Sequence, residues 1–305
     1  MDFTKYHGIG NDFVMLADYD RVMGPAGSLV PALVSALCDR RRGVGGDGLI
    51  RLIAPHADPE TAAAGAVLRM DYYNSDGAPA EMCGNGIRCL AVLALETGRI
   101  APGEHRILTG DGVKLVRIDA ARPERVTVQM GAPGLDCEDV PMAGTGPATL
   151  VGVETPGFGV VEGTGVSMGN PHFVVFAQDL GRTPDDRLVT TLGPQIERHA
   201  AFPRRTNVEF VTVLSQTAIQ MRVWERGVGE TLACGTGACA AAVASALLGR
   251  TGRQVEVRLP GGTLEVDWTP DGVVWMSGPA EKVFEGRLDS RWLSSAGVRP
   301  LEEVR

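Results

Sequence analysis

Two cysteines in the same short context are the residues best suited to chemistry in this chain. Cys83 begins the run CGNG (83–86) and Cys234 begins the run CGTG (234–237), and each run opens a predicted helix. A thiol at a helix start lies near the positive end of the helix dipole and near free backbone N–H groups. Both effects favour the thiolate, so we expect lowered pKa values. The glycines let a ligand approach the backbone, whose N–H groups suit a carboxylate.

Two thiols that face one carbon centre can invert it without a cofactor. One removes a proton from one face, and the other returns a proton to the opposite face. Metal binding is the alternative, but zinc sites usually contain closely spaced Cys or His pairs. Here five residues separate Cys83 from Cys89 and four separate Cys234 from Cys239, and neither pair has a nearby His-x-His. We therefore predict no metal and no cofactor, with Cys89 and Cys239 as inert core thiols.

The elements that position the two cysteines are predicted to be buried helices among many strands. Segments 86–97 and 237–248 have almost no polar face, which is typical of buried helices, and Gly98 and Gly249 suit their C-terminal ends. A third helix is predicted over 29–40, with Ser28 as its N-cap. Short β-branched or alternating segments predict strands. These strands cover residues 67–73, 113–118, 126–130, 208–214, 219–225, 255–259, 264–268 and 273–276.

An internal repeat organises these elements. GNDFV at 10–14 is echoed by GNPHFV at 169–174, and CGNG is echoed by CGTG. The separation from Asn11 to Cys83 is 72 residues, and that from Asn170 to Cys234 is 64. The repeat predicts an α/β fold of two pseudo-symmetric halves, each a curled β-sheet wrapped around a central apolar helix, with the active site in the cleft between them. We place the N-terminal half at 1–128, with 280–290 returning to it, and the C-terminal half at 129–279.

Five motifs together resemble the diaminopimelate epimerases. They are HGIGNDF (7–13), NSDG (74–77), EMCGNG (81–86), GNPH (169–172) and ERGVGETLACGTG (225–237). The resemblance extends from about residue 3 to 288. It implies a pyridoxal-independent, two-cysteine epimerase that interconverts LL- and meso-diaminopimelate in lysine and peptidoglycan precursor biosynthesis. It also implies a homodimer and a fold that agrees with the repeat.

The resemblance assigns roles to individual residues. Cys83 and Cys234 are similar to the acid/base pair of the family, and His172 lies beside the site, where it tunes one thiol. The substrate-binding residues implied are Asn11, Asn74, Gly84, Asn85, Asn170, Asn207, Glu225, Arg226, Gly235 and Thr236. Some members carry Gln where this chain has Gly48, so that contact is missing or is supplied by water or another residue. The tail 289–305 extends past the matched region and is assigned no role.

Read without the resemblance, several of these residues have structural explanations. The asparagines follow glycines or border turns, where Asn is common for backbone reasons. A lone histidine is often a packed residue, and the adjacent Glu225 and Arg226 can form a surface ion pair. However, a substrate with a second amino-acid end needs a buried anion and cation, and the planar fork of Arg suits a carboxylate. GVGGDG (43–48) fits a dinucleotide motif only weakly, because it follows an Arg-rich helical segment.

Composition limits the class of protein. The chain has 305 residues, of which 44% are hydrophobic and 22% charged, as in a globular protein with a sizeable core. Its 29 basic and 37 acidic residues give a net charge of −8, which argues against nucleic acid as a partner. No apolar run approaches the ~20 residues of a membrane helix. The first residues do not resemble a signal peptide, and six cysteines are few, so we expect a cytoplasmic location.

Two alternatives to the epimerase remain open on the sequence. One is an enzyme similar to the proline and hydroxyproline racemases, which also use two cysteines. The other is a non-catalytic binding relative with the same fold. The presence of both cysteines argues against the second alternative, and the ERGVGE and NSDG stretches argue against the first.

Overall fold

The computed structural model describes residues 1–295. Its strands form two groups, and each group is arranged around one apolar helix. The chain divides into unit 1, which holds residues 1–128 and the described residues from 279 on, and unit 2, which holds residues 129–278. Of the tail 289–305, residues 296–305 lie outside the part of the chain that the structure describes. Among residues 1–295, no helix is both long and apolar enough to span a bilayer.

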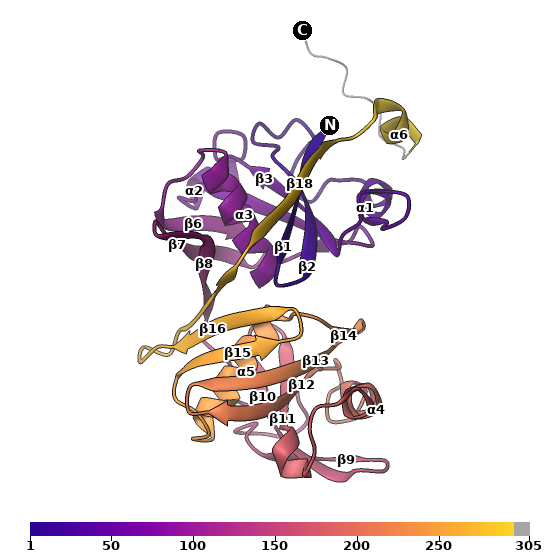
Figure 1. The fold of residues 1–305 in the computed structure, drawn as a ribbon, viewed down its shortest axis with the longest axis vertical. Helices are drawn as coiled ribbons and strands as arrows, with labels where there is room; N and C mark the ends of the chain where they lie inside the picture. Colours follow the sequence, from indigo (N-terminus) through magenta and orange to yellow (C-terminus); the bar gives the residue numbers. More distant parts are fainter. Residues whose placement is uncertain (296–305) are drawn as a thin grey trace. The chain divides into compact units, whose positions relative to one another are not determined.

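Unit 1 is a mixed sheet with α3 as its central helix (Figure 1). Its strands are β1 (Asp2–Gly8), β2 (Asn11–Leu16), β3 (Gly48–Ile53), β4 (Leu68–Asn74), β5 (Pro79–Ala80), β6 (Gly103–Thr109), β7 (Gly112–Asp119), β8 (Arg122–Gly131, which runs past the boundary) and β18 (Glu281–Arg287). Its helices are α1 (Pro31–Cys38), α2 (Pro59–Ala63), α3 (Gly84–Glu96) and α6 (Ser290–Ser295). Parallel pairings join β2 to β3 and β4 to β6, and the other named neighbours are antiparallel.

The apolar sequence of α3 is explained by its surroundings. The helix packs against β1, β2, β3, β7 and β18, and its residues from Gly84 to Ala94 are all buried. A helix enclosed in this way has no solvent-facing side, so a polar stripe would cost free energy. β18 pairs antiparallel with β1, from Asp2 opposite Arg287 to His7 opposite Glu281. The chain therefore returns to unit 1 at its end, and Figure 1 shows the yellow β18 beside the indigo β1.

Unit 2 repeats this plan around α5. Its strands are β9 (Val151–Thr155), β10 (Gly159–Ser167), β11 (Pro171–Phe176), β12 (Asn207–Ser215), β13 (Ala218–Glu225), β14 (Gly229–Thr231), β15 (Gln254–Leu259), β16 (Gly262–Trp268) and β17 (Val274–Pro279). Its helices are the 3₁₀ turn η1 (Ala177–Leu180), α4 (Asp186–Glu197) and α5 (Gly235–Leu247). β11 pairs parallel with β12 and β13 with β15, matching β2 with β3 and β4 with β6. The prediction of two repeated α/β halves is confirmed.

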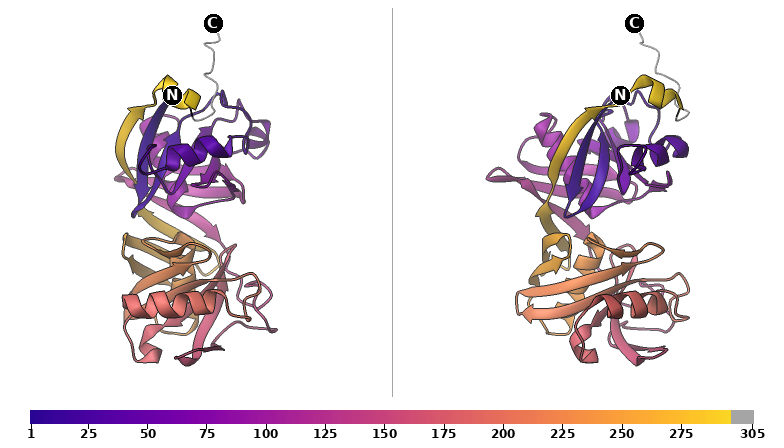
Figure 2. Two further views of the ribbon diagram at one scale, coloured as in Figure 1. Left: turned by 90° about the vertical axis from the view of Figure 1, so that its right-hand side faces the viewer. Right: turned by 45° about the vertical axis from the view of Figure 1, so that its right-hand side comes forward.

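Helix α4 was not predicted from the sequence. Asp185 caps it by accepting from Leu188 N at 2.7 Å, and Leu188, Val189 and Leu192 pack into an apolar cluster with β12. The helix lies across the strands of unit 2 in Figure 2. It contains Gly193 and Pro194, which together read as a turn signal in the sequence and hide an otherwise regular apolar stripe.

The ends of the predicted helices differ slightly from expectation. α1 begins at Pro31 with Val30 as its N-cap, so the prediction of Ser28 as N-cap is wrong. Proline suits this first helical position because its missing N–H has no partner there in any helix. Gly98 and Gly249 follow the C-caps of α3 and α5 with φ values of 69° and 67°, a left-handed conformation that glycine adopts without strain.

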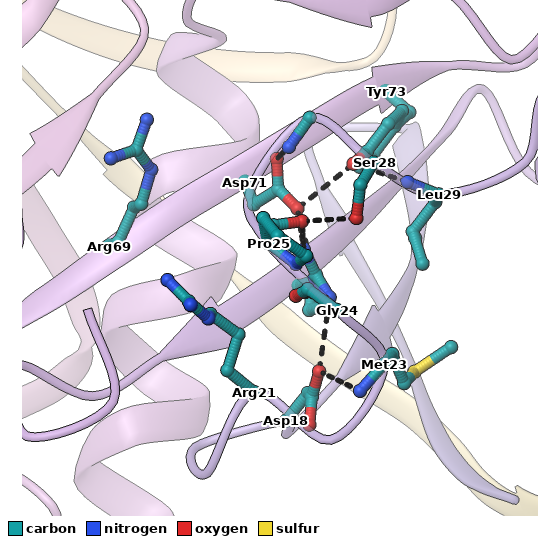
Figure 3. Close-up of polar contacts among 12 residues, drawn as sticks. Asp18, Arg21, Met23, Gly24, Pro25, Ser28, Leu29, Arg69, Asp71 and Tyr73 are labelled. Atoms are coloured by element: carbon teal, nitrogen blue, oxygen red, sulfur yellow. Dashed lines mark hydrogen bonds and ion pairs between the residues drawn. The ribbon is translucent and has the colours of Figure 1, made fainter. Parts of the chain in front are cut away.

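A fully buried arginine joins the sheet of unit 1 to the loop before α1. Arg51 on β3 donates to Asp71 at 2.6 Å and to Asp18 at 3.1 Å, and it also binds the carbonyls of Gly24 and Pro25. Figure 3 shows Asp71 and Tyr73 of β4 next to that loop. Since every partner of the guanidinium is an oxygen, its buried charge is compensated and the loop is held against the sheet.

Candidate active site

Cys83 is the N-cap of α3 in unit 1. Its backbone is extended, and its carbonyl accepts the first helical hydrogen bond from Ile87 N at 2.9 Å. The N–H groups of Gly84 and Asn85 lie in the first turn, where a helix provides no carbonyl to accept them. They are therefore positioned to bind an anion beside the partly exposed Cys83 thiol.

Asn11 and Asn85 meet at this thiol. The Oδ1 atom of Asn11 accepts from Cys83 Sγ at 3.6 Å and from Asn85 Nδ2 at 3.2 Å. Its own Nδ2 donates to Asp47 at 2.8 Å, and the buried Arg88 donates to Asn85 Oδ1 at 2.9 Å. Three of the predicted site residues of unit 1 are thus held together by a connected set of hydrogen bonds.

Asn74, another predicted site residue of unit 1, is bound by a tyrosine that lies outside the motifs quoted above. Tyr72 donates to Asn74 Oδ1 at 3.1 Å. A Cβ atom placed on Gly48 would lie 2.6 Å from the carbonyl oxygen of Tyr73 and 2.8 Å from the ring of Tyr72. The space that a longer side chain at position 48 would use is therefore already filled by the aromatic ring.

Cys234 occupies the corresponding position in unit 2. It is the N-cap of α5, and its Sγ accepts from Gly237 N at 3.4 Å and lies 3.6 Å from Thr236 Oγ1. Unlike Cys83, this cysteine is buried. Gly235 and Thr236 occupy the first turn of α5, as Gly84 and Asn85 do in α3.

The expected lowering of the pKa is wrong for Cys234. Burial raises the pKa of this thiol well above its ordinary value, and the nearby Glu225 and Glu209 carboxyls raise it further. The Thr236 hydroxyl and the Gly237 N–H act in the opposite direction but are outweighed. Removing the thiol from water and placing it among acids opposes the helix dipole on which the expectation was based.

Glu225, Arg226 and Asn207 lie together near the end of β13. The Arg226 backbone N–H donates to Asn207 Oδ1 at 2.8 Å, and Asn207 Nδ2 donates to the carbonyl of Pro171 at 2.9 Å. The Glu225 carboxylate accepts from Thr231 Oγ1, and burial raises its pKa. Among the residues that the structure describes, Glu225 and Arg226 do not form an ion pair with each other, so the surface-pair interpretation finds no support.

His172 is fully buried between Asn170 and a residue that sequence reasoning missed. Its Nε2 lies 2.9 Å from Asn170 Oδ1, and its Nδ1 lies 2.7 Å from Glu209 Oε1. Glu209 is also fully buried, and it stands between Val208 and Phe210 as the one charged residue of β12. A lone acid in such a strand was the signal that could have identified it.

No metal site accompanies these residues. Within residues 1–295, no group of three or more His, Cys, Asp or Glu side chains is arranged to hold an ion. All six cysteines are free thiols, and Cys89 and Cys239 are completely buried inside α3 and α5.

Comparison with known proteins identifies the family. The family model for diaminopimelate epimerase matches residues 3–135 and 164–283. The chain is 49% identical to the diaminopimelate epimerase of Moorella thermoacetica over 291 residues, which cover 94% of this chain and 98% of that protein. It is 47% identical to that of Pelotomaculum thermopropionicum over 296 residues, covering 95% and 100%.

Solved structures at lower identity share the fold. A hydroxyproline epimerase from Agrobacterium vitis matches with a TM-score of 0.65 at 15% identity, covering 100% of this chain and 98% of that one. A phenazine biosynthesis protein from Bacillus anthracis matches with a TM-score of 0.60 at 15% identity, covering 95% and 99%. These likenesses concern the fold alone, whereas the family model and the two full-length relatives decide the family: the chain belongs to the diaminopimelate epimerases.

Proposed function

We propose that this protein interconverts LL-diaminopimelate and meso-diaminopimelate, with Cys83 and Cys234 as the two acid/base groups. The observation that carries the proposal is that each cysteine is the N-cap of the central helix of its own repeat. Membership of the family supplies the substrate. Each thiol then has helix N–H groups beside it for the carboxylate on the reacting carbon.

In the proposed reaction, one thiolate removes the α-proton while the other thiol delivers a proton to the opposite face. This requires both cysteines to face the same α-carbon. The α-carboxylate binds the N–H groups of the two helix starts, which stabilise the charge that develops as the proton leaves. Because burial and two nearby acids keep the pKa of Cys234 high, its resting form is the thiol. In the proposed reaction, the Cys234 thiol is therefore the proton donor for the isomer whose α-proton Cys83 removes.

The far end of the substrate carries a second carboxylate and ammonium group. Glu225 and Arg226 are the residues proposed to hold it, together with Asn74, Asn170 and Asn207. Arg226 is exposed, and its Nη1 donates to the carbonyl of Arg204 at 3.3 Å. The other N–H groups of its guanidinium remain as donors for a carboxylate. A homodimer is expected from the resemblance and a cytoplasmic location from the sequence, and both stay predictions.

The experiment that tests the function is isotope exchange in deuterated water. Purified protein is incubated with LL-diaminopimelate, and α-deuterium incorporation and the appearance of the meso isomer are followed. Cys83→Ala and Cys234→Ala should each lower interconversion by about 10²–10⁴-fold, the usual contribution of a general acid or base. Cys89→Ala and Cys239→Ala are the matched controls, since these thiols lie in the same helices but point into the core. Full inversion by either site variant contradicts the two-base mechanism.

Two further assays separate the alternatives. Turnover of proline or hydroxyproline in place of diaminopimelate would favour the racemase alternative, and binding without exchange would favour a non-catalytic relative. Cofactor independence is tested by exhaustive chelation and by the absorption spectrum. A pyridoxal band, or activity that is lost to chelator and restored by zinc, contradicts it.

A further inference from the structure

Glu209 lies on the face of β12 that looks toward α5. Its neighbours Val208 and Phe210 pack into the apolar cluster that includes α4. Side chains alternate along a strand, so Glu209 points to the opposite side. There its Oε1 lies 2.7 Å from the place that a Cβ atom on Gly237 would occupy. Glycine at position 237 therefore lets this buried carboxyl approach the start of α5, whose N-cap is Cys234.

His172 connects Glu209 to Asn170 through the two nitrogens of one ring. β11 and β12 are adjacent parallel strands, so the two fully buried side chains approach each other from neighbouring strands. The ring lies 2.7 Å from Glu209 Oε1 on one side and 2.9 Å from Asn170 Oδ1 on the other. Asn170 is one of the residues proposed to contact the substrate.

The hydrogen-bonding atoms at these contacts determine which of them carry a proton. The amide oxygen of Asn170 can only accept, so His172 Nε2 must carry a proton. On the other side, either His172 Nδ1 donates to a Glu209 carboxylate, or a protonated Glu209 donates to Nδ1. Both arrangements hold one proton more than a neutral histidine beside a carboxylate. The pair Glu209–His172 therefore keeps a shared proton as long as Asn170 presents its oxygen.

The buried surroundings favour keeping that proton. Within the part of the chain that the structure describes, Glu209 Oε2 has no hydrogen-bond partner although it is buried. Burial raises the pKa of Glu209, while His172 acts to lower it. The groups that face Glu209 are His172 from β11, Cys234 at the start of α5 and Glu225 from β13. An acid in this setting holds a proton more readily than one in water.

We propose that Glu209 is a positioning residue which, through His172, keeps the Asn170 amide turned with its oxygen on the ring and its NH₂ group presented to the substrate. The proposal rests on the proposed function, in which Asn170 contacts diaminopimelate. Without the shared proton, His172 can present a bare Nε2. The amide of Asn170 then turns by half a rotation to donate to it, and its oxygen replaces the NH₂ group toward the ligand.

Two variants of Glu209 separate positioning from packing. Glu209→Gln retains an NH₂ donor for His172 Nδ1, as a protonated glutamate does, so its KM should stay within about threefold of wild type. Glu209→Leu has similar bulk but neither donor nor acceptor, and its KM should rise about tenfold, the scale of one hydrogen bond to a charged group. Because this contact binds the ground state and the transition state alike, its loss should appear mainly in KM.

A double-mutant cycle shows whether Glu209 acts through Asn170. In an Asn170→Ala background, Glu209→Leu should cause no further rise in KM, because the amide that it orients is gone. Additive effects overturn the proposal, as does a Glu209→Gln variant that is as impaired as Glu209→Leu. If Glu209→Leu does not fold, ¹⁵N NMR of the wild-type histidines decides, since a His172 Nε2 without a proton overturns the proposal and a protonated one supports it.

The cycle also distinguishes failure of the inference from failure of the proposed function. Interconversion of diaminopimelate by wild type is measured first, and its absence contradicts the function. Normal wild-type turnover with additive variants contradicts only the role of Glu209.

Discussion

The environment of Cys234 shows how burial competes with a helix start. A helix dipole and an N–H group stabilise a thiolate, but their effect at the surface is about 0.3–1 kcal/mol. Desolvation of a buried acid can shift a pKa by several units in the opposite direction. At Cys234 two carboxyls add to desolvation, so the raised pKa follows from the residues that surround the thiol rather than from the helix that begins there.

Alkylation of Cys234 should report this raised pKa. Only the thiolate reacts, and below the pKa its fraction rises tenfold for each pH unit, so the rate with iodoacetamide should increase about tenfold per unit from about pH 7 to 9. Glu225→Gln removes a charge that raises the pKa and should speed the reaction at fixed pH. Thr236→Val removes a hydrogen bond that lowers it and should slow the reaction. The measurement is mass spectrometry of the peptide that contains Cys234, and a plateau below about pH 8 would show an ordinary thiol.

Close packing around position 48 requires a glycine there. A Cβ atom there would lie 2.6 Å from the Tyr73 carbonyl oxygen, so the backbone of β3 or β4 must move to accept it. Gly48→Ala is therefore expected to lower the free energy of unfolding by about 1–3 kcal/mol, the usual cost of overpacking. Denaturant unfolding measures the change.

Gly252→Ala is the matched control for that substitution. Gly252 is exposed, and its added Cβ would meet only the carbonyl oxygen of Gln216 at 3.6 Å, an ordinary contact. Its effect should stay within about 0.5 kcal/mol. Equal effects of the two substitutions would mean that close packing at Gly48 does not matter.

At the scale of elements, the buried ion cluster of unit 1 should be important for stability. Arg51→Met removes the guanidinium that pairs with both Asp18 and Asp71, and leaves two nearly buried carboxylates without this partner. Breaking a buried pair in this way costs about 3–5 kcal/mol. Arg258→Met, which removes an exposed pair with Glu256, should cost about 0–1 kcal/mol. Thermal and denaturant unfolding of both variants measure the difference, and equal losses would contradict the role of Arg51.

The sequence predicts the elements that carry the cysteines well, because their signal is strong. The segments 86–97 and 237–248, which have almost no polar face, correspond to α3 and α5, which begin two residues earlier at Gly84 and Gly235. The shift arises because glycine and asparagine read as turn residues although they form a first helical turn here. Helix α4 was missed because the pair Gly193–Pro194 resembles a break.

The networks behind the site could not be read from the sequence in the same way. The contact of Asn11 with Asn85 joins residues 74 positions apart, and that of His172 with Glu209 joins residues 37 positions apart. Such contacts depend on the register of neighbouring strands, which composition and periodicity do not specify. The motif resemblance identified Asn11, Asn85 and His172, but Glu209 and Tyr72 lie outside every quoted motif and needed the structure.

At the scale of the whole molecule, the repeat is visible in the sequence because it recurs in the motifs and in the order of elements. The same sequence of parallel and antiparallel pairings surrounds α3 and α5. Each unit also contains an apolar cluster of its own, one around Leu33 and Leu49 and the other around Leu192 and Phe210. A unit with its own core can in principle fold by itself.

The connectivity of the two units is unequal, and this leads to a prediction about truncated chains. Unit 2 is continuous over residues 129–278, whereas unit 1 needs the returning strand β18, which pairs with β1 from Asp2 to His7. A chain that ends at residue 278 loses this ladder and the contact of Arg88 Nε with the Pro279 carbonyl at 3.3 Å. We expect unit 1 to unfold at a lower temperature in that chain, while unit 2 retains its own transition.

The fragment 129–278 is the control for that assignment, because its melting should coincide with the transition that the truncated chain retains. Calorimetry of the full chain, the truncated chain and the fragment supplies the comparison, and circular dichroism shows whether the fragment is folded. Residues 1–278 should also lack epimerase activity, since Cys83 and Asn11 belong to the unit that loses its strand. A truncated chain that melts like the full one would show that β18 adds little to unit 1. A fragment 129–278 that does not fold would show that its apolar cluster is insufficient without the rest of the chain.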